Sequence, residues 1–101
     1  MDDHIQLTFT KTSETTISYD IYFEGKVAGE ITTQINNPQF LEDLFIERNH
    51  RRKGIGKFII NHFNIKILRC TTWNKVGISF YKALGFHEAE KDIYLITFKR
   101  H

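Results

Sequence analysis

The chain has 101 residues, a mass of 12.0 kDa and a formal net charge of +2. This length predicts one domain over residues 1–101, and the content of 41% hydrophobic and 14% aromatic residues is enough for a packed core, which excludes a disordered chain. The low net charge argues against a nucleic-acid-binding protein, and no apolar run approaches the length of a membrane span.

Alternating apolar residues predict that the first half of the chain forms strands. The expected strands cover residues 5–10, 17–23, 27–35 and 40–46. Glu24, Gly25 and Lys26 form a turn that joins the second and third strands into a hairpin. The fourth strand is apolar enough to be central in a sheet.

A helix is predicted from about Gly54 to Phe63, because Ile55, Ile59 and Phe63 fall on one stripe. Asn64 can then take the left-handed position that usually follows a helix. A strand over residues 65–70 comes next. The strand at 40–46, this helix and the strand at 65–70 form a β-α-β crossover, which is expected to be right-handed.

A second helix is predicted over residues 74–84, with Val76, Phe80 and Leu84 facing the core and Gly85 ending it. Strands over 86–89 and 93–98 close the chain. The predicted fold class is therefore α+β: a mixed, mostly antiparallel, twisted sheet with two main helices.

Cys70 is the only cysteine, so no intrachain disulfide can form. Residues 1–4 are acidic with no apolar segment behind them, so we expect no signal peptide. Both features suit a cytoplasmic protein. Cys70 itself is expected to be a small core residue and not a nucleophile. The five histidines are scattered without ligand spacing, so no metal site is expected.

A basic, glycine-bearing corner, RRKGIGK from Arg51 to Lys57, lies between the strand at 40–46 and the first helix. Exposed N–H groups at a helix N-terminus attract anions, and glycines let a phosphate approach the backbone. Two familiar nucleotide loops do not fit. A P-loop needs more widely spaced glycines followed by a hydroxyl, and a dinucleotide fingerprint needs a third glycine where Ile59 stands.

The pattern that fits is R-x-x-G-x-G, although on its own it also matches an ordinary basic helix start. A second segment, NKVGISFYKALGF, carries Asn74, Gly77 three residues on, Tyr81 seven residues on, and then Gly-Phe. Together the two segments resemble, in order, two signatures of the GNAT superfamily of N-acetyltransferases. The resemblance runs from about residue 40 to the C-terminus and implies a GNAT-like fold that uses acetyl-CoA, without a metal.

The resemblance implies a cofactor site at the basic corner. Backbone N–H groups from Arg52 to Lys57 would take the pyrophosphate, and Arg51, Arg52 and Lys57 would add charge for the phosphates. The strand edge near Ile46 would pair with the pantetheine arm and polarise the thioester carbonyl. The expected cofactor-binding residues are Ile46, Arg51, Arg52, Lys53, Gly54, Ile55, Gly56, Lys57 and Asn74.

Asn74, Gly77 and Tyr81 share one helix face by spacing, and we expect this face to differ from the face of Val76 that packs on the core. Gly77 in a helix favours close approach by a ligand or backbone. The family places its general acid at the position of Tyr81. The alternatives are a helix N-cap for Asn74 and a buried aromatic with a satisfied hydroxyl for Tyr81.

A lysine-like acceptor amine, with a pKa of about 10.4, needs a base before it can attack. Glu42 is the candidate because it shares strand parity with Leu44 and Ile46, nearer the acceptor end. An ordinary strand carboxylate is the alternative reading of Glu42, and Asp43 is the other candidate base.

Family members carry two helices between the first two strands, and residues 11–16 are too few for them. The acceptor side is therefore expected to be open. This suits a small-molecule amine such as a polyamine, a peptide terminus or a protein amine, a site completed by a homodimer partner, or a catalytically silent CoA-binding module. A small nucleic-acid-binding domain is the remaining alternative.

Overall fold

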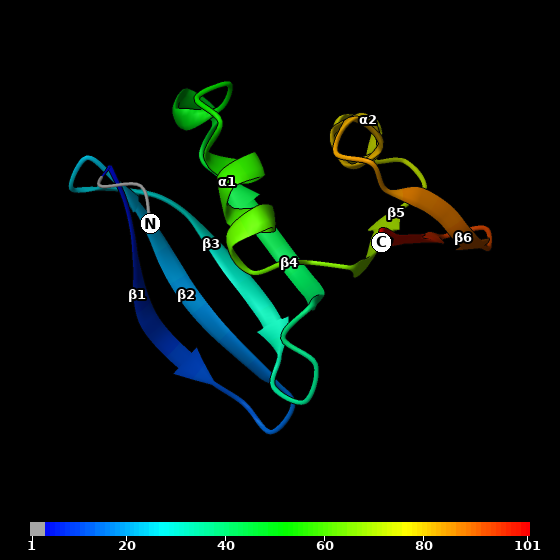
Figure 1. The fold of residues 1–101 in the computed structure, drawn as a ribbon, viewed down its shortest axis with the longest axis horizontal. Helices are drawn as coiled ribbons and strands as arrows, with labels where there is room; N and C mark the ends of the chain where they lie inside the picture. Colours follow the sequence, from blue (N-terminus) through cyan, green and yellow to red (C-terminus); the bar gives the residue numbers. More distant parts are fainter. Residues whose placement is uncertain (1–3) are drawn as a thin grey trace.

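The computed structural model describes residues 4–101, which form one seven-stranded sheet with two helices (Figure 1). The prediction about the acidic start of the chain concerns residues 1–3 as well, and these lie outside the described range. In residues 4–101 no helix is long and apolar enough to cross a membrane. The elements are β1 Ile5–Thr12, β2 Thr16–Phe23, β3 Lys26–Gln34, β4 Phe40–Ile46, η1 Arg48–His50, α1 Ile55–His62, β5 Ile67–Thr71, α2 Lys75–Ala83, β6 His87–Lys91 and β7 Leu95–Lys99.

The order of the strands across the sheet is β1-β2-β3-β4-β5-β7-β6. Only β4 and β5 are parallel, and every other neighbouring pair is antiparallel. The predicted fold class, a mixed and mostly antiparallel sheet with a β-α-β crossover through α1, is therefore confirmed. Strand β4 has the bounds that the sequence predicted.

The first half of the sheet is held by short connections. Glu24 and Gly25 both have positive φ, 51° and 81°, which is the backbone of a tight two-residue hairpin turn. Ser13 to Thr15 are the whole connection between β1 and β2, and the Ser13 N–H donates to the Thr16 carbonyl at 2.9 Å. No helix lies between these two strands.

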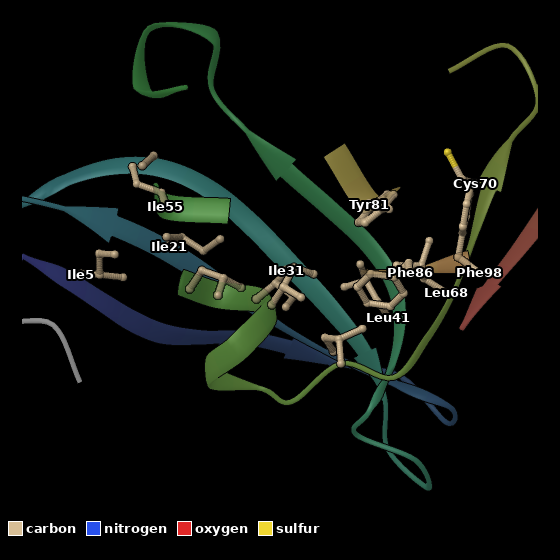
Figure 2. Close-up of a cluster of buried hydrophobic side chains, with 14 of the residues drawn as sticks. Ile5, Ile21, Ile31, Leu41, Ile55, Leu68, Cys70, Tyr81, Phe86 and Phe98 are labelled. Carbon is tan, nitrogen blue, oxygen red and sulfur yellow. The ribbon is translucent and has the colours of Figure 1, made fainter. Parts of the chain in front are cut away.

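Helix α1 covers β2, β3 and β4 with a stripe of isoleucines. Ile55, Ile59 and Ile60 are buried, and Asn64 has a φ of 53°, as expected for the residue that follows the helix. Figure 2 shows Ile5, Ile21, Ile31 and Ile55 in one part of the core, and Leu41, Leu68, Tyr81, Phe86 and Phe98 in the part nearer β5.

Strands β5, β6 and β7 begin one or two residues later than predicted. The Ile65 N–H donates to the Ile60 carbonyl and finishes the turn after α1, so β5 starts at Ile67. The Asp92 carboxylate accepts from the N–H groups of Leu95 and Tyr94, which extends the β6–β7 turn and lowers the pKa of Asp92. Side-chain turns of this kind are not visible in apolar periodicity.

The predicted packing face of α2 is wrong at its first turn. Val76 is 73% exposed, whereas Tyr81, placed on the opposite face in the prediction, is 8% exposed and belongs to the core. The Tyr81 ring lies 5.8 Å from Phe86 and 6.2 Å from Phe98. Contacts with these rings orient α2 so that Tyr81 faces the core. Phe80 and Leu84 are partly buried, and Val76 borders a cavity.

Candidate active site

Strands β4 and β5 pair only at Phe40 with Ile67 and at Leu41 with Leu68. Beyond these pairs the two strands separate, as Figure 1 shows. The N–H of Glu47 donates to the Ala28 carbonyl of β3, so by strand alternation the backbone groups of Leu44 and Ile46 point away from β3. The backbone N–H and C=O groups of Leu44 and Ile46 therefore face the side where β5 no longer pairs with β4.

The loop before α1 presents backbone N–H groups without competition from the protein. Arg52 and Gly54 have positive φ, 64° and 77°, and α1 begins at Ile55 with no side-chain cap and no acidic residue in its first turn. A Cβ at Gly54 would meet no atom within 4 Å, so the space in front of this residue is empty of protein. The arrangement fits a phosphate group.

Arg51 links this loop to the end of β4. Its Nε donates to the Ile46 carbonyl at 3.0 Å, while the rest of the side chain is exposed. The Ile46 carbonyl therefore already has a partner. A pantetheine arm paired with this edge would rely on the Ile46 N–H and on the backbone groups of Leu44.

A cavity of about 940 Å³ lies between β4, the loop before α1 and helix α2. The predicted cofactor residues line it with one exception, since the Lys53 ammonium lies over the Phe23 ring, 5.3 Å from its centroid. The sequence did not indicate Phe80, which reaches across from α2. A Cβ on Gly56 would lie 2.9 Å from the end of the Phe80 ring, so a glycine at this position leaves room for the contact between the two helices.

A second cavity, of about 420 Å³, lies on the other side, between β4 and β5. Glu42 and Asp43 form one wall, and Arg69 and Cys70 belong to the other. Leu44, Asn74 and Tyr81 line both cavities, so the two meet at these three side chains. A molecule in one cavity can therefore contact a molecule in the other at Tyr81.

The Tyr81 hydroxyl has no protein hydrogen-bond partner among residues 4–101, so the alternative of a satisfied buried phenol does not describe it. Burial raises the pKa of Tyr81 above its ordinary value, and the charges of Cys70 and Asp43 raise it further. The hydroxyl therefore stays protonated at neutral pH, which is the form that a proton donor needs.

Asn74 is the N-cap of α2, which was the plainer of its two readings. Its Oδ1 accepts from the Gly77 N–H at 2.9 Å, and a Cβ on Gly77 would lie 2.5 Å from the Asn74 Nδ2. The small residue at 77 therefore leaves room for the folded-back Asn74 amide, and Gly77 also lines the larger cavity. Asn74 also hydrogen-bonds Cys70, whose pKa is raised by burial and lowered in part by this bond.

The strand parity assumed for Glu42 is interrupted by an irregularity in β4. Leu41 pairs with Thr33 and Asp43 pairs with Thr32, so Glu42 is an extra residue in the register. Its Oε1 accepts from the Gln34 Nε2 at 2.6 Å and its side chain is exposed. Glu42 and Asp43 nevertheless both border the smaller cavity, so the two candidate carboxylates stay together near Tyr81.

A family model for the acetyltransferase (GNAT) domain matches residues 15–88. The chain therefore belongs to the GNAT acetyltransferase family. It is similar to the aminoglycoside N(6')-acetyltransferase type 1 of Acinetobacter baumannii, with 32% identity over 71 residues, which cover 61% of this chain and 49% of that protein. The corresponding enzyme of Acinetobacter genomosp. 13 is 30% identical over 78 residues, which cover 68% of this chain and 51% of that protein. The chain spans about half the length of these curated relatives.

Solved structures give the same fold. An acetyltransferase from Thermus thermophilus superposes with a TM-score of 0.74 at 17% identity, covering 88% of this chain and 66% of that one. A GNAT family acetyltransferase from Elizabethkingia anophelis, solved with acetyl-CoA bound, has a TM-score of 0.71 at 9% identity and covers 99% of both chains.

Proposed function

We propose that this chain is an acetyl-CoA-dependent N-acetyltransferase that moves an acetyl group to a primary amine by direct attack in a ternary complex. The observation that carries the proposal is the meeting of the two cavities at Tyr81, with a basic, uncapped helix start on one and two carboxylates on the other. We also propose that residues 1–101 act as one catalytic domain in the cytoplasm. The free, buried thiol of Cys70 is compatible with that compartment, because cysteines stay reduced there.

The larger cavity fits the cosubstrate. The N–H groups from Arg52 to Lys57 would hold the pyrophosphate, and the cations around them would hold the phosphates. The open edge of β4 would pair with the pantetheine arm and polarise the thioester carbonyl. Acetyl-CoA supplies the activated acetyl group, and the protein orients it towards the smaller cavity.

Tyr81 is the proposed proton donor to the departing thiolate. It lines both cavities, and burial keeps its hydroxyl protonated. Glu42 is the proposed base for an acceptor amine that enters charged, with Asp43 as the second candidate. The relatives named above act on aminoglycosides, so a primary amine on a cationic small molecule is the first acceptor class to try.

A CoA-binding module without catalysis has one observation in its favour, because the β1–β2 connection is only three residues and contains no helix. Melting the protein with and without acetyl-CoA, in EDTA, tests the common part of both readings. Saturation at about 100 times Kd should stabilise the fold by roughly 2.7 kcal/mol. CoA release with a panel of amines then separates them: binding without release from any amine rejects the transferase.

A further inference from the structure

Arg100 follows β7, and its side chain reaches the C-terminal ends of both helices. Its Nη1 donates to the Leu84 carbonyl at 3.2 Å and to the Asn61 Oδ1 at 3.2 Å. Its Nη2 donates to the Ile65 carbonyl at 3.1 Å. Leu84 is the C-cap of α2, whereas Asn61 lies in the last turn of α1 and Ile65 in the turn after it. One side chain therefore links the ends of the two helices.

The Arg100 side chain is partly buried and is held from several directions. Its guanidinium lies over the Phe86 ring, 4.7 Å from the centroid. Within residues 4–101 no carboxylate pairs with it. Its partners are neutral oxygens near helix ends, where the helix dipole favours a cation. A planar guanidinium can bind several acceptors and a ring at once, which the ammonium of a lysine cannot do in this geometry.

The two helices belong to different halves of the sheet. Helix α1 lies over the half made of β1 to β4, and α2 lies with the half made of β5, β6 and β7 (Figure 1). Within residues 4–101 the two halves share two residue pairs, between β4 and β5. The loop proposed to hold the pyrophosphate is on the first half, and Tyr81 is on the second. The distance between these parts of the site therefore depends on few contacts.

The helices also meet near the start of α1, where the end of the Phe80 ring lies against Gly56. A contact at this point alone would let α2 turn about it, and the Tyr81 hydroxyl would move with the helix. Arg100 supplies a second contact, near the opposite end of α1. Two separated contacts fix both the distance between the helices and the angle between them.

A second series of contacts leads from Arg100 to Tyr81 itself. Phe86, under the guanidinium, has its ring 5.8 Å from the Tyr81 ring, and its N–H donates to the Tyr81 carbonyl at 3.1 Å. The Gly85 N–H donates to the Lys82 carbonyl at 3.0 Å, and Gly85 has a φ of 92°. These two hydrogen bonds form a Schellman motif at the end of α2. A displacement of Arg100 would therefore reach both the ring and the backbone of Tyr81.

From these contacts, and from the proposed function, on which this step rests, we infer that Arg100 is a positioning residue for the acetyl transfer. It lines neither cavity and holds the Tyr81 hydroxyl at a fixed place relative to the loop of residues 51–57. A proton donor must lie about 3 Å from the atom that it protonates. A misplacement of about 1 Å can cost about 100-fold in rate. Binding of acetyl-CoA depends on the loop and on β4, so it should not require Arg100.

The kinetic test uses Arg100→Gln and, as the matched control, Lys99→Gln. The Lys99 ammonium is exposed and has no hydrogen bond or ion pair within residues 4–101. In Arg100→Gln, kcat for CoA release should fall by about 10- to 100-fold, the scale of a misplaced group. The Kd for acetyl-CoA should stay within about twofold, because the phosphate loop is at the other end of α1. Lys99→Gln should match the wild type in both quantities.

Two further variants define what Arg100 contributes. Arg100→Lys keeps the charge near the helix ends and loses the planar fork, so it should behave as Arg100→Gln does. Asn61→Ala removes one exposed link to α1 and leaves the contacts with Leu84 and Phe86. It should melt as the wild type does and lower kcat by about three- to tenfold, a smaller misplacement. If Arg100→Gln fails to fold, Asn61→Ala decides the question.

Combination with Tyr81→Phe separates positioning from stability. In that background no hydroxyl remains to be positioned, so Arg100→Gln should lower kcat by less than about twofold. Any lowering of the melting temperature by Arg100→Gln should persist, because the contacts with the helix ends are lost in both backgrounds.

The place of Tyr81 can also be followed without turnover. In protein labelled with carbon-13 in the tyrosine rings, the NMR signal of Tyr81 is identified by its loss in Tyr81→Phe. It should be one narrow line in the wild type and in Lys99→Gln. In Arg100→Gln and Asn61→Ala it should shift or broaden, as expected for a ring that exchanges between positions.

The inference is overturned if the Tyr81 signal is unchanged in Arg100→Gln, or in Asn61→Ala where Arg100→Gln does not fold. It is also overturned if Arg100→Lys keeps the wild-type kcat, or if Arg100→Gln lowers kcat equally with and without the Tyr81 hydroxyl. Failure of the proposed function looks different, because then no amine releases CoA from the wild type. A Tyr81 signal that moves in that case keeps Arg100 as the residue that positions Tyr81 and rejects the reaction alone.

Discussion

The proposed cofactor side, at the larger cavity, and the proposed acceptor side, at the smaller cavity, are built in opposite ways. The proposed phosphate-binding groups of the cofactor side come from one contiguous segment, Arg51 to Lys57, whose N–H groups and cations are neighbours in sequence. The acceptor side is assembled from β4, β5, α2 and β7, with no more than four consecutive residues from any one of them. A local motif can be read directly, whereas a wall made of four elements exists only after the sheet has opened between β4 and β5.

Tyr81 lies where the two sides meet, and Tyr81→Phe should have the largest effect. The variant keeps the ring contacts to Phe86 and Phe98 and removes a hydroxyl that has no hydrogen-bond partner within residues 4–101. CoA release should fall by about 10²–10⁴, the usual scale for a positioned acid. The affinity for acetyl-CoA and the melting temperature should change little.

A stable Tyr81→Phe protein with the wild-type rate of CoA release would remove Tyr81 from the mechanism. A destabilised protein with normal specific activity would return the side chain to a purely structural role. Measuring the melting temperature and the turnover on the same preparation distinguishes these outcomes.

Gly54→Val tests whether the cofactor side depends on its loop backbone. The side chain would fill the empty space in front of Gly54, so acetyl-CoA should bind at least about tenfold more weakly, or 1.4 kcal/mol. Gly25→Val is the matched control. Both glycines have positive φ, 77° and 81°, and open space at Cβ, so both variants share a backbone penalty of about 1–2 kcal/mol.

Only Gly54→Val should lose affinity for acetyl-CoA in a calorimetric titration. Equal losses in the two variants would show that backbone strain, and not occupation of the phosphate site, causes the effect. Unchanged binding in Gly54→Val would reject the loop as the pyrophosphate site.

How much of the molecule could be read from its sequence follows the same division. The strand β4, the loop before α1 and the order of the elements could be predicted because apolar periodicity and glycine spacing are local signals. The orientation of α2 could not be predicted in this way, because it is fixed by contacts of Tyr81 with the rings of Phe86 and Phe98, which come later in the chain. The extra residue at Glu42 was equally hidden, since it is defined only by the pairing of β4 with β3.

The buried phenol also predicts how stability depends on pH. The unfolded chain loses the Tyr81 proton near pH 10, whereas burial raises the folded-state pKa above that value. The folded protein then binds the proton more tightly, so its stability is complete below pH 10 and falls as the pH rises. Between pH 9 and 11 the wild type should lose about 1 kcal/mol more of its free energy of unfolding than Tyr81→Phe. Parallel curves from urea denaturation of the two proteins would show that the hydroxyl is hydrated in the folded state.

Glu42→Gln should have the smallest effect and gives the sharpest view of the acceptor side. The carboxylate is exposed and already accepts from Gln34, so its contribution as a base is expected to be about threefold to tenfold, well below the usual scale. The effect should depend on the acceptor. An alkylamine with a pKa of about 10.4 is charged at pH 7 and needs a base, whereas an α-amine with a pKa of about 8 needs little help. The ratio of kcat/KM for the alkylamine to kcat/KM for the α-amine should therefore fall in Glu42→Gln, with acetyl-CoA affinity unchanged.

Asp43→Asn is the comparison, because Asp43 borders the same cavity in regular strand pairing. If the ratio falls only in Asp43→Asn, the base is Asp43 and Glu42 is a strand carboxylate held by Gln34.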